Sequence, residues 1–139
     1  MLFRSLQKTR SYTFATAAPA LLATALSTSL QLIEHEEWRR THLHALIARL
    51  RTGLAAGLQG SHWRLSESQT AIQPLLIGSN AEALAVMQAL QERGLWVPAI
   101  RPPTVPEGTA RLRIALSAAH TEADVDALVQ ALGTLASRI

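Results

Sequence analysis

The sequence contains no cysteine and a single lysine, Lys8, so several kinds of chemistry have few or no candidate residues. Without cysteine, disulfides and thiolate metal sites are excluded, which is compatible with a reducing cytoplasm. Aromatic residues make up only 4% and charged residues 17% of the 139 positions, whereas hydrophobic residues reach 48%. These proportions argue against intrinsic disorder and predict one domain with a core of Leu, Ala and Ile.

Nearly all basic residues are arginines, and they are spread among acidic and apolar residues. No Lys/Arg run is interleaved with aromatic side chains, so nucleic-acid binding is not expected despite the formal charge of +3. The five histidines lack the i, i+4 spacing of a helical zinc pair, so no metal site is expected. There is no Gly-x-Ser-x-Gly motif and no phosphate-cradling glycine loop, and the pattern indicates no catalytic residue in this chain.

Residues 1–29 have two interpretations. They include Arg4, Lys8 and Arg10 but no acidic residue, and residues 15–26 are apolar, as in a transit or secretory signal. However, Pro19 interrupts the apolar run, which is also too short to span a bilayer. The alternative is an entry segment followed by an Ala/Leu-rich helix, and we expect this arrangement in a cytoplasmic protein without a membrane segment.

Apolar residues in positions 19–58 recur at spacings of three and four, which predicts helix. The segment is predicted as one long helix, or as two helices with a bend near residues 34–37. One apolar stripe passes through Leu22 and Leu26, and a second passes through Leu50.

The rest of the chain alternates between strand and helix signals. Pro74 in the apolar run at residues 72–77 favours an edge strand or a bulge. Ser79 and Glu82 have the spacing of a capping box, and Gly94 has the position of a helix C-terminal glycine. The predicted elements are a short strand at 63–65, a strand at 72–77, a helix at 79–94, a strand at 95–100, a loop at 101–108, a strand at 110–117 and a helix at 121–137.

This order predicts an α+β fold, in which a long N-terminal helix or helix pair precedes a small sheet with helices packed on one face. From residue 72 onward the elements follow as strand, helix, strand, strand, helix. Within the first of these helices Leu84, Met87 and Leu90 are expected to face the core.

Two neighbouring segments carry candidate binding residues. Arg111 and Arg113 alternate with apolar residues and therefore share one strand face, where two guanidinium groups suit a carboxylate or a phosphate. Alternation alone favours a plainer interpretation, a solvated strand face. The loop at residues 101–108 contains Arg101, Thr104 and three prolines, and a rigid binding loop and a simple connector are equally compatible with it.

Three stretches together resemble the C-terminal domain of the α-oxoamine synthases, which are fold-type I pyridoxal-phosphate (PLP) enzymes: residues 99–106 (AIRPPTVP), 108–114 (GTARLRI) and 117–121 (SAAHT). Residues 72–75 (IQPL) are also similar, and the proline loop most resembles the family members of biotin biosynthesis. The resemblance implies a PLP-dependent acyltransferase that acts as a homodimer. It implies decarboxylative condensation of L-alanine with a pimeloyl thioester, carried by coenzyme A or an acyl carrier protein.

The resemblance also implies roles for individual residues. Arg113 matches the arginine that holds the amino-acid carboxylate, and Thr104 matches a substrate-contacting threonine. Arg101 lies beside it and is implied to bind the acyl substrate or the carboxylate. Thr16, in the segment FATAAP, resembles a residue that reaches the cofactor phosphate of the other subunit.

The family's Schiff-base lysine, ring-stacking histidine and pyridine-binding aspartate precede this region, and Lys8 does not match the lysine motif. We therefore expect a fragment, with residues 1–18 as the linker from a PLP-binding domain and residues 19–139 as the C-terminal small domain. Alone, it is expected neither to bind PLP covalently nor to catalyse the condensation.

Two other functions are compatible with the residue pattern. One is a stand-alone α+β module, regulatory or otherwise, that binds a small carboxylate through Arg111 and Arg113. The other is a structural or interaction domain whose apolar N-terminal segment forms an exposed patch.

Overall fold

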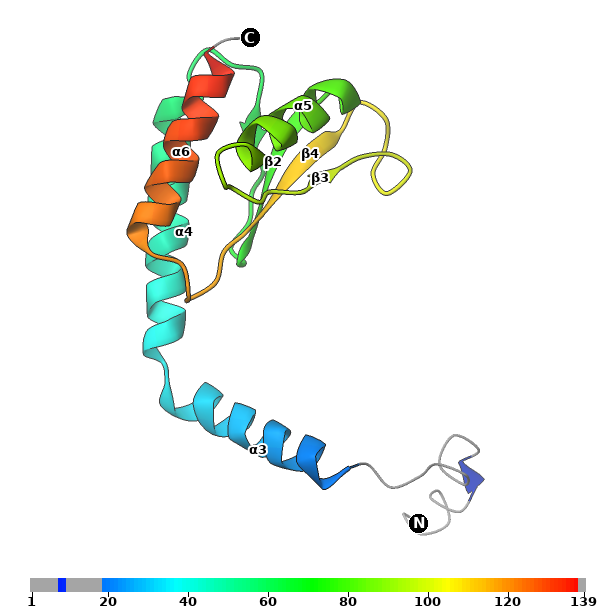
Figure 1. Cartoon of the computed structure of the whole chain (residues 1–139), viewed down its shortest axis with the longest axis vertical. Helices are drawn as coiled ribbons and strands as arrows, with labels where there is room; N and C mark the ends of the chain where they lie inside the picture. Colours follow the sequence, from blue (N-terminus) through cyan, green and yellow to red (C-terminus); the bar gives the residue numbers. More distant parts are fainter. Residues whose placement is uncertain (1–7, 10–18, 138–139) are drawn as a thin grey trace. The chain divides into compact units, whose positions relative to one another are not determined.

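The computed structural model describes residues 8–9 and 19–137, which belong to two compact units, residues 1–37 and 38–139 (Figure 1). In the first unit, helix α3 (Ala20–His35) begins after Pro19 and buries none of its residues. The second unit begins with helix α4 (Trp38–Gly57). Of the two predicted alternatives for this segment, the structure has the pair of helices. No helix within residues 8–9 and 19–137 has both the length and the apolarity needed to cross a membrane.

The second unit contains an antiparallel four-stranded sheet with the order β1-β2-β4-β3. The predicted succession from residue 72 onward is confirmed. The elements that follow α4 are β1 (Arg64–Leu65), β2 (Ile72–Gly78), α5 (Asn80–Gln91), β3 (Ala99–Ile100), β4 (Ala110–Ala115) and α6 (Glu122–Ala136).

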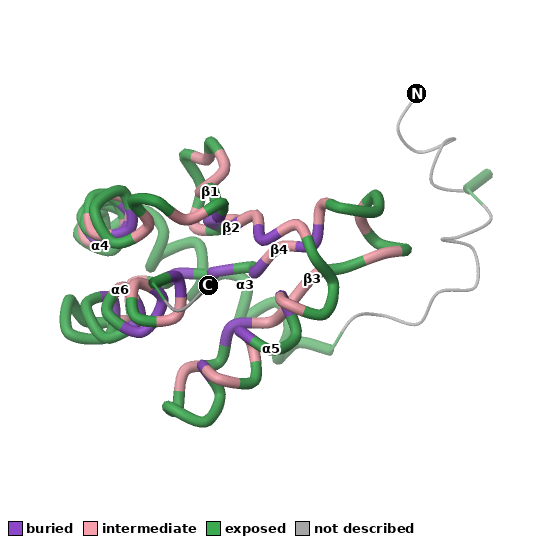
Figure 2. Tube along the Cα trace, turned by 90° about the horizontal axis from the view of Figure 1, so that it is seen from above, coloured by how far each residue is buried: buried purple, intermediate pink, exposed green. Residues whose placement is uncertain are grey.

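The helices of this unit gather on one side of the sheet, which confirms the predicted α+β architecture (Figure 2). Alternate residues of the inner strands point toward them: Leu75 and Ile77 of β2 and Leu112 and Ile114 of β4 are all buried. Leu50 of α4 and Leu132 of α6 complete the same core. No helix within residues 38–137 covers the opposite side of the sheet, which we call the open face.

Local signals set the helix ends as predicted. At the start of α6, Thr121 N donates to Asp124 Oδ2 at 2.7 Å, and Asp124 N donates to Thr121 Oγ1 at 3.2 Å. After α5, Gly94 adopts a positive φ of 77°, and Leu95 N donates to Leu90 O at 3.0 Å. Glycine reaches this left-handed conformation without a steric penalty, so it closes the helix.

The start of α5 has only half of the expected capping box. Ser79 Oγ accepts from Glu82 N at 3.4 Å, as the spacing predicts. The Glu82 carboxylate, however, accepts from Trp63 Nε1 at 2.7 Å. A long-range contact has thus taken the place of the expected local bond.

Two predictions about packing are wrong. Leu84 is exposed, and the buried face of α5 is formed by Ala83, Val86 and Leu90, because the sheet meets the helix on a slightly rotated face. Pro74 lies in an inner strand, and the register irregularity lies between Leu76 and Gly78 instead.

An inner strand accommodates Pro74 because β1 has already ended opposite it. Ser66 N donates to Pro74 O at 2.9 Å. The return bond from residue 74 is impossible, since proline has no N–H. The Ser66 carbonyl instead accepts from Arg51 Nη1 at 3.1 Å.

Candidate functional site

The candidate site begins with the alternation of β4. Leu112 and Ile114 are 0% and 2% exposed and point into the core. Arg111 and Arg113 therefore lie on the open face, Arg111 half-buried and Arg113 exposed. The predicted common face of the two arginines is confirmed.

Strand pairing extends this arrangement across the whole sheet. Arg64 of β1 pairs with Leu76 of β2, Leu76 pairs with Arg111 of β4, and Arg111 pairs with Ile100 of β3. Paired residues of neighbouring strands share a face. Arg64, whose side chain is exposed, therefore lies on the open face together with the two arginines of β4.

Arg111 differs from Arg64 and Arg113 because it bonds the end of the loop that joins β3 to β4, which we call the proline loop. Its Nε donates to the Thr109 carbonyl oxygen at 3.1 Å. Thr109 in turn donates to the Pro106 carbonyl from its backbone N at 3.2 Å and from its hydroxyl at 2.7 Å. The end of the loop is thus held against the strand that follows it.

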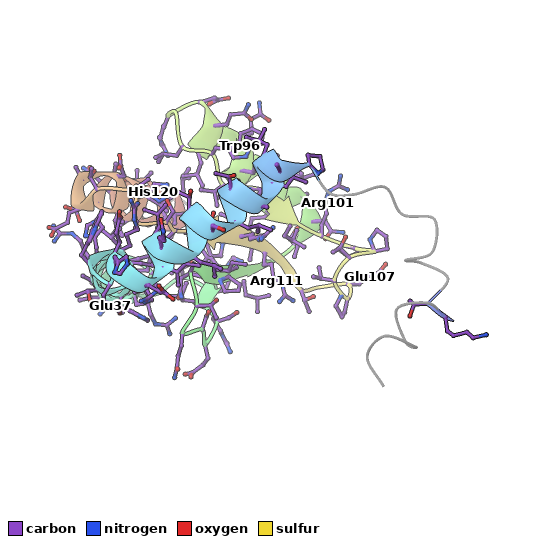
Figure 3. The ribbon with its side chains drawn as sticks, turned by 90° about the horizontal axis from the view of Figure 1, so that it is seen from below. Glu37, Trp96, Arg101, Glu107, Arg111 and His120 are labelled. Atoms are coloured by element: carbon purple, nitrogen blue, oxygen red, sulfur yellow. The ribbon has the colours of Figure 1, made fainter. Side chains whose placement is uncertain are left out.

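The proline loop (residues 101–108) joins β3 to β4, and Figure 3 shows Arg101 and Glu107 on it. Arg101 and Thr104 are both exposed. Thr104 N donates to Arg101 O at 3.1 Å, which makes a tight turn at its start. Arg101 directly follows Ile100, the partner of Arg111. Both ends of the loop therefore meet the sheet beside Arg111, and the predicted loop residues lie at the margin of the open face.

The arginines of the open face differ in their partners from Arg49 on α4. Arg49 of α4 bonds Asp126 at 2.6 Å and Glu122 at 2.7 Å, and these carboxylates raise the pKa of Arg49. Within the part of the chain that the structure describes, no carboxylate lies within ion-pair distance of Arg64 or Arg113. Their guanidinium groups are available for an external anion.

The motif at residues 117–121 has a structural role in the turn from β4 to α6. Ser117 N donates to His120 Nδ1 at 3.0 Å, and the His120 carbonyl accepts from His42 Nε2 at 3.0 Å. This motif therefore joins α4 to the end of the strand that carries Arg113.

Other predicted residues lie away from this face or cannot be placed. Thr16 lies outside the described residues, and its predicted cofactor contact stays a prediction. Lys8 is exposed and belongs to the first unit. Among the described residues, no three His, Cys, Asp or Glu side chains gather in a group that could hold a metal ion.

Sequence reasoning missed Arg64. The sequence indicates its position only through alternation: Trp63 and Leu65 point toward the core, so Arg64 between them points away from it. The strand is only two residues long, which makes this alternation a weak indication. Its position beside Arg111 depends on the pairing of β1 with β2.

Comparisons with known proteins identify relatives of this chain. A family model described as "Aminotransferase class I and II" matches residues 4–132. The chain is 80% identical over 131 residues to "8-amino-7-oxononanoate synthase 1" of Polaromonas sp. (strain JS666), covering 94% of this chain and 32% of the relative. It is 70% identical to the 8-amino-7-oxononanoate synthase of Paracidovorax citrulli, with the same coverage.

Solved structures share the fold. A serine palmitoyltransferase from S. paucimobilis with a bound PLP–myriocin aldimine superimposes with a TM-score of 0.80 at 27% identity, covering 98% of this chain and 34% of that one. The predicted resemblance to the oxoamine synthases is confirmed by the curated relatives. This chain spans about a third of the length of the relatives that it matches.

Proposed function

Because the chain belongs to the aminotransferase class I and II family, we propose that it forms the substrate-facing part of a PLP-dependent acyltransferase. The reaction is the decarboxylative condensation of L-alanine with a pimeloyl thioester in biotin biosynthesis. The observation that carries this proposal is Arg113, an exposed guanidinium on the open face with no carboxylate partner among the described residues. The 80% identity to a relative named 8-amino-7-oxononanoate synthase supports the choice of reaction.

In this proposal Arg113 holds the carboxylate of L-alanine. A guanidinium fork binds both oxygens of a carboxylate at once, which fixes the orientation of the bound amino acid as well as its position. A strand in the middle of a sheet is a rigid support for such a group. The backbone N of Arg113 also donates a hydrogen bond of 2.9 Å to the Pro98 carbonyl oxygen.

Arg101 and Thr104 complete the substrate contacts from the proline loop. The Thr104 hydroxyl contacts the substrate, and Arg101 binds the acyl substrate or the carboxylate. Loop residues on a rigid scaffold are common binding residues, and Arg111 provides part of that rigidity through its bond to Thr109. Thr16 is assigned to the cofactor phosphate of the second subunit in a cytoplasmic homodimer.

The described residues do not form a complete site for PLP. A Schiff-base lysine needs a desolvated pocket that lowers its pKa, whereas Lys8, the only lysine of the sequence, is exposed. We therefore assign no reaction step to the cofactor on this chain. In this proposal the 139 residues supply substrate contacts and do not catalyse the condensation by themselves.

A chimera tests the proposed function. In the chimera this chain replaces the matching third of the Polaromonas relative. The assay supplies carboxyl-labelled L-alanine and a pimeloyl thioester as substrates and measures the labelled carbon dioxide that is released. Arg113→Gln is expected to lower kcat/KM for L-alanine about 100-fold, the upper range for losing charge-assisted hydrogen bonds. Arg93→Gln removes the same charge from an exposed site after α5 and is expected to leave the rate unchanged. An inactive wild-type chimera, or equal rates for both variants, contradicts the proposal.

A further inference from the structure

We infer that Arg64 is a second anion-binding residue of the open face, and that Arg64 and Arg113 together hold the two ends of an aliphatic dicarboxylate. The extension to the substrates rests on the proposed function, in which Arg113 holds the amino-acid carboxylate and Arg64 holds the terminal carboxylate of the acyl chain. The pairing of the two guanidinium groups rests on the sheet geometry alone.

Strand register determines how far apart the two arginines lie. Arg64 is opposite Leu76, and Arg113 is opposite Pro74, two residues away along β2. The arginines are thus two strands apart across the sheet and two residues apart along it. Strand spacing and rise give roughly 12 Å between their Cα atoms. One carboxylate cannot occupy both guanidinium groups at that separation without bending both side chains toward it.

The surface between the two arginines is apolar. Leu76 and Pro74 lie on the open face of β2 between Arg64 and Arg113, and both are half-buried. They form a strip that can contact methylene groups, with one cation at each end. This pattern fits a ligand with an aliphatic middle and an anion at each end, and it does not fit a compact anion such as phosphate.

The charges favour this ligand as well. Neither Arg64 nor Arg113 has a carboxylate within ion-pair distance among the described residues. The third arginine of this face, Arg111, directs its Nε to the Thr109 carbonyl at 3.1 Å and is half-buried. Of the three arginines on the strands of this face, the two at the ends of the strip are therefore the exposed ones.

In the proposed reaction the two partners together carry anions of this kind. The amino acid brings a carboxylate, and the pimeloyl chain ends in another carboxylate beyond a row of methylene groups. With Arg113 on the amino-acid carboxylate, Arg64 is placed to bind the far end of the acyl chain. Arg64 then determines specificity, because an acyl chain without a terminal carboxylate leaves it unpaired.

The test measures ligand binding to the 139-residue chain without cofactor. Arginine Nε–H signals are followed by NMR while pimelate, heptanoate or malonate is added. Pimelate is expected to shift the signals of both Arg64 and Arg113 and to bind about tenfold more tightly than heptanoate, since it forms a second charge-assisted contact. Malonate is too short to span the strip and is expected to resemble heptanoate.

Variants separate the inference from general charge effects. Arg64→Gln is expected to reduce pimelate affinity to that of heptanoate, Arg64→Lys to retain part of the difference, and Arg93→Gln to have no effect. Equal binding of pimelate and heptanoate, an unchanged affinity in Arg64→Gln, or no binding of pimelate would each overturn the inference. Because no turnover is measured, an inactive chimera together with Arg64-dependent pimelate binding refutes the proposed reaction and leaves the dicarboxylate site standing.

Discussion

Arg51 donates a hydrogen bond of 2.8 Å from Nη1 to Oε1 of Gln73, and this contact joins helix α4 to the central region of the sheet. Gln73 is fully buried. Its Nε2 donates to Thr70 O at 2.6 Å and to Ser68 O at 3.3 Å, so the same side chain also fixes the connection before β2. Every polar group of this side chain has a partner, which offsets the cost of burying it.

Replacing Gln73 tests this network. Gln73→Ala leaves the Thr70 carbonyl without its donor and opens a small cavity, so the free energy of unfolding is expected to fall by about 2 kcal/mol. Urea unfolding followed by circular dichroism measures the change. Gln69→Ala, in the same connection but exposed, is expected to have almost no effect. Equal stability of the two variants would show that the network contributes little.

The contact of α4 with α6 gives a second prediction. A Cβ on Gly53 would lie 2.8 Å from Val129 Cγ1, whereas one on Gly57 would lie 3.6 Å from Gly133 Cα. The β-branched Val129 has little rotamer freedom on a helix, so Gly53→Ala is expected to destabilise the fold by about 1–3 kcal/mol.

Gly57→Ala is the matched control, since it adds the same methyl group at an ordinary contact distance. It is expected to be neutral, or to stabilise the helix by up to about 1 kcal/mol through higher helix propensity. Val129→Ala in the Gly53→Ala background is expected to relieve the clash. Thermal unfolding of the three variants measures both effects, and equal melting temperatures for the two single variants would contradict the prediction.

The capping box of α6 makes stability depend on pH. The pKa of Asp124 is lowered by hydrogen bonds from Thr121, first from its backbone N–H and then from its hydroxyl. A carboxylate whose pKa is lower in the folded state stabilises the fold above its unfolded pKa of about 3.9, and this contribution is lost as the pH falls through the folded value.

Asp124→Asn is therefore expected to flatten the decline in unfolding free energy below the ordinary carboxyl range. Urea unfolding at a series of acidic pH values compares the slopes. Glu107→Gln, which removes an exposed carboxylate from the proline loop, is expected to leave the slope close to that of the wild type. Parallel curves for the wild type and Asp124→Asn would contradict the assigned cause.

Arg111 is expected to stabilise the proline loop. Arg111→Ala removes the bond from Nε to Thr109 O, which is worth about 1 kcal/mol, so loop amides are expected to exchange about fivefold faster. Hydrogen exchange at the amides of Thr104 and Thr109 measures this, because both donate to carbonyls within the loop. Arg113→Ala changes an exposed arginine of the same strand and is expected to leave these rates unchanged. Similar rates in both variants would exclude the bracing role.

Several features were predictable because their causes are local. Thr121 and Asp124 bond each other within one helical turn, and the left-handed conformation of Gly94 concerns few neighbours. The alternation of Arg111 and Arg113 with apolar residues also fixes their common face without reference to other strands. Such features depend on residues close together in the sequence.

Other features depended on distant partners. Glu82 accepts from Trp63 instead of closing its own capping box, and Pro74 is tolerated in an inner strand because Arg51 serves the Ser66 carbonyl. In each case the decisive group lies far away in the sequence. Pattern reasoning therefore placed the elements and misjudged these contacts.

The sequence by itself determined the α+β succession, the helix ends and the pair of arginines on one strand, since hydrophobic periodicity and short-range hydrogen bonds specify them. Only the tertiary structure decided that Arg64 joins Arg113 on the open face, with Leu76 and Pro74 between them. Strand register causes the difference: a slip of one residue would turn Arg64 toward the core, and nothing within the two residues of β1 fixes that register alone.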